Sequence, residues 1–257
     1  MKHIITTLAI CFVSFQTFAQ KTVSATKILK DVKAGIDVQV TNATIDGILD
    51  LTYMNEAIAK LPKRKKWWNN GGSNTVEKQI TGKLIFKNCI FKDDVLAYIP
   101  DETSGYTFIA NFEEDVSFTN CTFERKSMFK YSVFEKNADY SNAKFKDDST
   151  FKYAKFERNS SFENVIFKEP STFKYSKFDR FVSFANAIFS DSAIFKYAEF
   201  NNGVSFNNTK FKEDLNIKYT KVRGEFDIQN MDVAYEIDSK YTKINGDSFS
   251  KYLIKNK

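Results

Sequence analysis

Residues 173–189 read FKYSKFDRFVSFANAIF, and Phe173, Phe178, Phe184 and Phe189 follow one another at intervals of five, six and five residues. This spacing fits neither an amphipathic helix, with an apolar period of about 3.6, nor a strand that alternates over its whole length. A mostly small residue stands two positions before each of these phenylalanines, as in a short strand with two inward side chains. The stretch therefore predicts short strands joined by polar corners.

The same pattern recurs every eleven residues from Val116 to about Ile244. A chain of short strands and turns can bury its apolar face only against its own neighbouring repeats, which makes it a solenoid. Two residues after every second anchor, asparagines and tyrosines alternate, so that each type returns after two repeats. These positions are Asn120, Asn142, Asn164, Asn186, Asn208 and Asn230, and Tyr131, Tyr153, Tyr175, Tyr197, Tyr219 and Tyr241. We therefore expect eight coils, at 38–59, at 84–115 and, from 116 to 247, six of two repeats each.

The segments SFENVIF, TFKYSKF, SFANAIF and IFKYAEF resemble the phenylalanine-rich form of the pentapeptide-repeat family. The resemblance covers nearly all of the chain after residue 19, because the small residue and the anchor recur together throughout. It implies an all-β fold, a right-handed four-sided parallel β-helix with four repeat units per coil. The chain departs from a strict five-residue repeat by one extra residue at alternate corners, hence coils of about 22 residues.

The repeat predicts a single domain over residues 20–257. Open β-helix ends expose unpaired strand edges, so both ends should be covered. Residues 24–35 and 248–256 carry helix-start residues, apolar side chains on one face and, in the first segment, a terminating glycine, which predicts a short cap helix at each end. Insertions at 57–80 and 92–106 interrupt only the first two coils and are places to look for function.

Residues 1–19 read as a secretory signal peptide, with Lys2 before an apolar run and a small residue, Ala19, before the expected cleavage site. Lipidation at Cys11 is not expected, because Ile10 stands where a small residue is needed. No later apolar stretch approaches the roughly 20 residues of a transmembrane helix. We expect an exported protein, periplasmic or extracellular.

Cleavage would remove the single histidine, His3, and leave 37 basic and 32 acidic residues, a net charge of +5. A chain without histidine has no Ser-His-Asp or Cys-His nucleophile pair and no histidine-based zinc site. We therefore predict no catalytic residues, no metal site and no cofactor. Cys89 and Cys121 occupy the same inward position in successive coils and are expected to be free buried thiols rather than a disulfide.

The first candidate binding surface is the column of FKY corners, here called the Lys–Tyr ladder. It consists of Lys130, Tyr131, Lys152, Tyr153, Lys174, Tyr175, Lys196, Tyr197, Lys218, Tyr219, Lys240 and Tyr241. A second lysine column follows two residues after the tyrosines, at Lys155, Lys177, Lys221 and Lys243. Together they predict a basic, aromatic face about 25 Å long that could bind a polyanion. The alternative interpretation is that stacked tyrosines only stabilise the corner and the lysines only solubilise it.

The second candidate is the segment KRKKWW in the first insertion, with Arg64, Lys65, Lys66, Trp67 and Trp68. Exposed tryptophans beside several cations could hold a sugar ring, a partner protein or a membrane interface. The alternative is that both tryptophans fold back onto the first coils as a local core.

We therefore predict an exported, non-enzymatic binding or scaffold protein at the cell envelope. The expected partner is an acidic glycan or an envelope protein, and nucleic acid is not expected. A polysaccharide-cleaving β-helix enzyme is the disfavoured alternative, because the acidic pairs, such as Asp93 with Asp94 and Asp147 with Asp148, lie at different corners and form no column.

Overall fold

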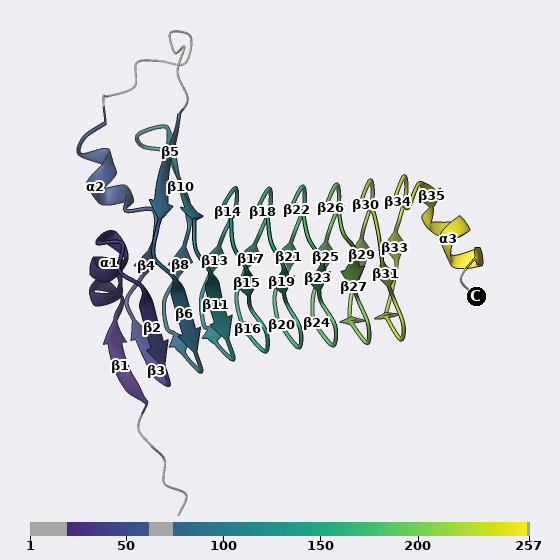
Figure 1. Cartoon of the computed structure of the whole chain (residues 1–257), viewed down its shortest axis with the longest axis horizontal. Helices are drawn as coiled ribbons and strands as arrows, with labels where there is room; N and C mark the ends of the chain where they lie inside the picture. Colours follow the sequence, from purple (N-terminus) through teal and green to yellow (C-terminus); the bar gives the residue numbers. More distant parts are fainter. Residues whose placement is uncertain (1–19, 62–73, 256–257) are drawn as a thin grey trace, which may run out of the picture.

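The computed structural model describes residues 20–61 and 74–255. Within them the chain winds into a long stack of nearly identical coils (Figure 1). Four sheets of parallel strands form the sides, which confirms the expected right-handed four-sided β-helix. We number the faces 1 to 4 in the order in which the chain visits them within a coil.

Faces 1 and 3 are eight-stranded parallel sheets, in agreement with eight coils. Face 1 consists of β2 (Val38–Thr41), β6 (Leu84–Lys87), β11 (Val116–Thr119), β15 (Ala138–Asp139), β19 (Ser160–Ser161), β23 (Val182–Ser183), β27 (Val204–Ser205) and β31 (Phe226–Asp227). Face 3 consists of β4 (Leu49–Asp50), β8 (Val95–Leu96), β13 (Ser127–Met128), β17 (Ser149–Thr150), β21 (Ser171–Thr172), β25 (Ala193–Ile194), β29 (Leu215–Asn216) and β33 (Ile237–Asp238).

Faces 2 and 4 are longer because the ends of the chain and the insertions add strands to them. Face 2 consists of β1 (Lys21–Ser24), β3 (Ala43–Asp46), β7 (Ile90–Phe91), β12 (Thr122–Phe123), β16 (Lys144–Phe145), β20 (Ile166–Phe167), β24 (Ile188–Phe189), β28 (Lys210–Phe211) and β32 (Asp232–Val233). Face 4 consists of β5 (Thr75–Ile80), β10 (Tyr106–Phe112), β14 (Val133–Phe134), β18 (Lys155–Phe156), β22 (Lys177–Phe178), β26 (Glu199–Phe200), β30 (Lys221–Val222), β34 (Lys243–Ile244) and β35 (Asp247–Ser248), with β9 (Tyr98–Asp101) beside β10.

Helices lie at both ends of the stack, as expected (Figure 1). Helix α1 (Ala25–Lys33) begins at Ser24, whose side chain accepts a hydrogen bond from the Thr26 N–H at 3.2 Å. Helix α3 (Phe249–Lys255) closes the other end, with Phe249 buried against the last coil. A third helix, α2 (Met54–Ile58), opens the first insertion.

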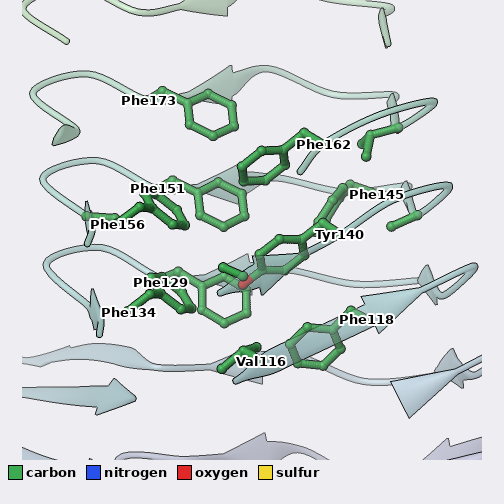
Figure 2. Packing of buried hydrophobic residues seen from close by; sticks show 14 of the residues in the cluster. Val116, Phe118, Phe129, Phe134, Tyr140, Phe145, Phe151, Phe156, Phe162 and Phe173 are labelled. Carbon is green, nitrogen blue, oxygen red and sulfur yellow. The ribbon is translucent and has the colours of Figure 1, made fainter. Parts of the chain in front are cut away.

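The interior is four columns of stacked aromatic rings, one behind each face. Figure 2 shows rings from these columns in the central coils. Phe151, Phe173 and Phe195 stack on face 3 with centroids 5.0 Å apart and nearly parallel planes. Rings from opposite faces meet edge to face across the interior, as Phe162 of face 1 and Phe173 of face 3 do at 5.2 Å and 86°. Each buried phenylalanine contributes roughly 1.5–3 kcal/mol, so the repeated anchor is sufficient to hold the coils together.

At two of the four corners, one residue per coil lies in the left-handed backbone region, except where the second insertion replaces the corner between faces 3 and 4. Asparagines do so between faces 1 and 2, as at Asn164 with φ 57°, and tyrosines between faces 3 and 4, as at Tyr175 with φ 61°. The outward polar residue before each of these corners often accepts a backbone N–H. Thr150 Oγ1, for example, accepts from the Lys152 N–H at 3.3 Å. Short polar side chains thus terminate each strand by satisfying the first N–H of the turn.

The two insertions leave the coil at the corner between faces 3 and 4 and pair with each other. Strand β5 runs parallel to β10, with Thr75 opposite Thr107 and Ile80 opposite Phe112. Strand β9 completes the group by pairing antiparallel with β10. The insertions therefore extend face 4 outward as a three-stranded sheet at one end of the Lys–Tyr ladder.

The described cysteines are both buried and unbonded, as expected for Cys89 and Cys121. Each thiol donates to backbone carbonyls, Cys89 to those of Val40 and Lys87 and Cys121 to those of Phe86 and Thr119. Both cysteines act as small core residues.

Candidate functional site

The Lys–Tyr ladder runs along the corner between faces 3 and 4. Its tyrosine rings stack with centroids 4.6 to 4.8 Å apart. The backbone holds this spacing, because each tyrosine N–H donates to the carbonyl of the ladder lysine one coil on, as from Tyr153 to Lys174 at 2.9 Å. The ladder is therefore a regular array with the repeat of the coils.

Stacking hides the faces of the ladder rings from solvent. Between Tyr153, Tyr175 and Tyr197 the ring planes differ by only 1° and 2°, so each ring lies flat against the next. Tyr153 and Tyr175 are 37% and 36% exposed, which leaves ring edges and hydroxyl groups accessible. Such a surface offers little to a sugar ring that binds by stacking on an aromatic face.

Each ladder lysine lies beside the tyrosine that follows it. Lys152, Lys174 and Lys196 place Nζ 5.3, 5.2 and 5.4 Å from the centroids of those rings. Within the described residues, no carboxylate lies within 4.0 Å of these three ammonium groups, whereas Lys218 reaches Asp238 at 4.0 Å. Burial and the charges of Lys130 and Lys174 lower the pKa of Lys152, because like charges stand on both sides of it.

The second lysine column is different, because acidic residues pair with three of its four members, Lys155, Lys177 and Lys221. Lys155 contacts Glu157 at 2.6 Å and Asp179 at 3.8 Å. Lys177 contacts Asp179 at 3.4 Å, and Lys221 contacts Glu199 at 2.9 Å. The hydrogen bond to Glu157 raises the pKa of Lys155, the opposite of the shift at Lys152.

The basic face is therefore narrower than the lysine spacing predicts. Its unneutralised charge lies mainly at Lys152, Lys174 and Lys196 of the ladder, whereas Lys155, Lys177 and Lys221 of the second column are paired with carboxylates. The neutralising residues do have a signal in the sequence, because Glu135, Glu157 and Asp179 recur once per coil, each directly after a face 4 anchor.

Tyr98 is a further member of the site that sequence reasoning missed. Its ring lies 5.9 Å from that of Tyr131, tilted by 51°, so it ends the stack on the side of the insertions. Lys130 places Nζ 4.6 Å from the Tyr98 ring centroid and donates to its hydroxyl at 3.0 Å. The insertion at this corner breaks the period of the coils, so only the structure brings Tyr98 into the column.

The other candidate residues, Arg64, Lys65, Lys66, Trp67 and Trp68, lie outside the described residues. The segments on either side are described, ending at Leu61 and resuming at Asn74. Both sequence-based interpretations of this loop therefore stay predictions.

Residues 20–61 and 74–255 contain no group of three or more His, Cys, Asp or Glu side chains that could hold a metal ion. In the same ranges, none of the helices combines the length and apolar character needed to cross a bilayer.

A family model described as pentapeptide repeats, in nine copies, matches residues 110–152, 129–177 and 173–221. Together these segments span residues 110–221, which includes most of the uninterrupted coils. Comparison with curated proteins and with solved structures gives no significant match.

Proposed function

Since the chain is a pentapeptide-repeat protein, we propose that it is an exported, non-enzymatic binding or scaffold protein of the cell envelope whose Lys–Tyr ladder binds an extended polyanion. Export is supported by the leader-like residues 1–19. A non-enzymatic role is supported by the lack of histidine after residue 19 and by the dispersal of the acidic pairs.

The observation that carries the proposal is the row of ladder lysines without acidic partners. Lys152, Lys174 and Lys196 keep their charges one coil apart, although the neighbouring lysine column is paired with carboxylates. The lowered pKa of Lys152 reflects burial and this mutual repulsion. A linear ligand with repeated negative charges would relieve the repulsion along the whole row.

The stacked tyrosines favour a polyanion over an uncharged glycan. Because their faces are covered by neighbouring rings, they supply hydroxyl donors and a rigid edge instead of a platform for a sugar. Specificity would then come from charge spacing along the ligand, with the tyrosine hydroxyls bonding to its oxygen atoms.

The test compares two triple variants that remove the same charge from neighbouring columns. The ladder variant carries Lys152→Gln, Lys174→Gln and Lys196→Gln, and the control carries Lys155→Gln, Lys177→Gln and Lys221→Gln. Binding to heparin and polygalacturonate is measured by calorimetry at two salt concentrations, with dextran as the uncharged polymer. We expect the ladder variant to lose roughly tenfold in affinity, about 1.4 kcal/mol from three exposed charges.

The control variant should stay close to the wild-type affinity. Failure of the wild-type protein to bind either polyanion would exclude the proposal, and equal losses in both triples would reduce it to non-specific charge attraction. A Trp67→Ala/Trp68→Ala variant in the same assay tests the segment KRKKWW. A loss of affinity in that variant alone would assign polyanion binding to this segment instead of the ladder.

Export has its own test, because it depends on the leader and not on the ladder. Fractionation of cells that produce the full chain should recover the protein outside the cytoplasm, with an N-terminus at Gln20 by mass spectrometry. Recovery of intact chain in the cytoplasm would contradict an envelope role.

A further inference from the structure

The N-terminal end of the solenoid is covered on two sides and open on a third. Strand β1 adds one rung to face 2 by pairing with β3. Helix α1 buries Ala25, Ile28 and Val32 against the first coil. Face 1 has no such addition, since β2 is its terminal strand among the described residues (Figure 1).

The outer side of β2 presents unused backbone groups. Val38 and Asn42 donate their N–H groups to Lys83 and Lys87 in the next coil, at 2.8 and 2.9 Å. Backbone groups of alternate residues point to opposite sides of a strand, so those of Gln39 and Thr41 face away from the stack. No other described strand pairs with that side, and an unpaired edge of this kind is a template for another strand.

A cavity of about 520 Å³ lies beside this edge, between α1, β1 and β2. Its apolar lining includes Val23, Ile28, Val38 and Val40. In the next six coils the position of Val40 is taken by an aromatic ring, from Phe86 to Phe206. The first coil therefore ends the face 1 aromatic column with a smaller side chain and leaves space above it.

The register of β1 indicates which residue type belongs in this space. Lys21 pairs with Ala43, at the usual offset of one coil. The same offset counted back from Val40 along the sequence reaches a phenylalanine, Phe18, five residues before Val23 as the repeat requires, so the repeat pattern favours an aromatic side chain for this space. Cleavage after Ala19, as the leader predicts, would separate this phenylalanine from the chain.

We propose that the slot between α1, β1 and β2 binds an extended peptide strand of a partner protein. The strand pairs with the free backbone groups of Gln39 and Thr41 and places one aromatic side chain in the cavity above Val40. Strand addition of this kind gives affinity through main-chain bonds and specificity through the pocket.

A single extended segment fits this slot better than a second copy of the protein does. The slot has room for one added strand, because β1 and α1 extend beyond β2 on either side of it. The same projections on another copy would keep its own β2 from reaching the edge. The proposal does not depend on the polyanion site, but it does assume that the leader is removed.

The test uses the chain that begins at Gln20 and a synthetic peptide of sequence SFQTFA, which reproduces residues 14–19. Calorimetry should show binding, and hydrogen exchange should show new protection at the Gln39 and Thr41 amides. A peptide with alanine at the second phenylalanine should bind at least about tenfold more weakly, since it loses most of the roughly 1.5–3 kcal/mol of a buried aromatic side chain.

Two protein variants complete the design. Val40→Phe should fill the cavity and abolish peptide binding while the heparin affinity stays unchanged. A chain that retains residues 14–19 should bind the added peptide more weakly, because it carries the same sequence as a tethered competitor for the slot. The proposal is overturned if the wild-type chain ignores the peptide, if the alanine peptide binds equally well, or if Gln39 and Thr41 are protected only in an end-to-end dimer.

Discussion

Tyrosine and asparagine occupy the same backbone conformation at opposite corners of each coil. Tyr175 has φ 61° and Asn186 has φ 58°. The left-handed region costs most residues about 1–2 kcal/mol, whereas asparagine is tolerated there. Stacking between aromatic rings contributes about 0.5–1.5 kcal/mol per pair, and Tyr175 has a neighbour on each side. Stacking between neighbouring rings thus offsets the cost of the left-handed backbone at the ladder tyrosines.

Tyr140 gives the sharpest test at the residue scale. It is fully buried in the face 1 column, stacked between Phe118 and Phe162 at 5.5 and 5.0 Å (Figure 2). Its hydroxyl has no hydrogen-bond partner among the described residues, and an unsatisfied buried polar group costs about 1–3 kcal/mol. We expect Tyr140→Phe to raise the free energy of unfolding by about 1 kcal/mol, measured by urea denaturation.

Phe162→Tyr is the matched control for Tyr140→Phe, since it adds a hydroxyl in the next coil of the same column. That variant should lose stability. A destabilised Tyr140→Phe variant would show that the hydroxyl is bonded in solution, to a buried water molecule for instance.

At the scale of elements, the corners depend on glycine where two coils approach closely. Gly203 has φ +93°, and a Cβ there would lie 2.9 Å from the Glu225 carbonyl oxygen. Gly246 has φ +90°, but nothing lies within 4 Å of a Cβ at that position. The two positions thus have the same backbone conformation and differ in the space around them.

We predict that Gly246→Ala loses about 1–2 kcal/mol from the backbone alone. Gly203→Ala should lose about 1–3 kcal/mol more, because the added methyl group forces the neighbouring coil to shift. Urea unfolding of the two variants checks the difference. Equal losses would mean that the neighbouring coil moves aside at no cost.

The C-terminal helix should depend on pH through Asp247. Hydrogen bonds from Lys251 and Lys255, at 2.7 and 2.5 Å, lower the pKa of this carboxyl to about 2, below its ordinary value of 3.8. Because the folded pKa is the lower one, the contribution is fully present above the ordinary value and is lost as pH falls toward about 2.

We therefore expect the amides of α3 to lose protection from hydrogen exchange between pH 4 and 2, ahead of those of the central strands. Asp247→Asn should show the weaker protection already at neutral pH and little change on acidification. Protection of α3 that stays constant across this pH range in the unmodified protein would contradict the role of the carboxylate.

For the whole molecule, stability should vary along the stack because each coil contacts only its neighbours. All four anchors of the coil at 160–181 are buried phenylalanines. In the last coil, Val233 and Ile237 replace larger or better buried residues and are only partly buried. Hydrogen exchange followed by mass spectrometry should show strands β31 to β34 opening at lower free energy than β19 to β22. Uniform protection would indicate that the stack unfolds as one unit.

The coil architecture was predictable because every coil repeats the same contacts. The anchor at Phe151 predicts those at Phe173 and Phe195, and the alternation of Asn and Tyr predicts the length of a coil. The structure adds the contacts of the insertions, which do not follow the period of the coils. Pairing of β5 with β10 depends on two insertions of unrelated sequence, so the repeat pattern does not predict it.

The candidate site was only partly predictable for the same reason. The rows of Lys152 and Tyr153 follow from spacing, but the net charge of a row depends on side chains from other coils. Asp179 contacts Lys155 and Lys177, which belong to successive coils, and this sharing separates the neutral column from the charged one. A count of lysines along the sequence treats the two columns as equivalent.

In the uninterrupted coils, paired residues lie one coil apart in the sequence, as Val116 and Ala138 do. A whole coil can therefore be removed without changing how the remaining strands pair. Removing residues 138–159 would join Asn137 to Ser160 in the register that Asn159 now has, so that Val116 would lie opposite Ser160. The rod would shorten by about 4.8 Å and keep its remaining columns in line. The number of coils therefore sets the length of the rod and of the Lys–Tyr ladder that runs along it, in steps of one coil.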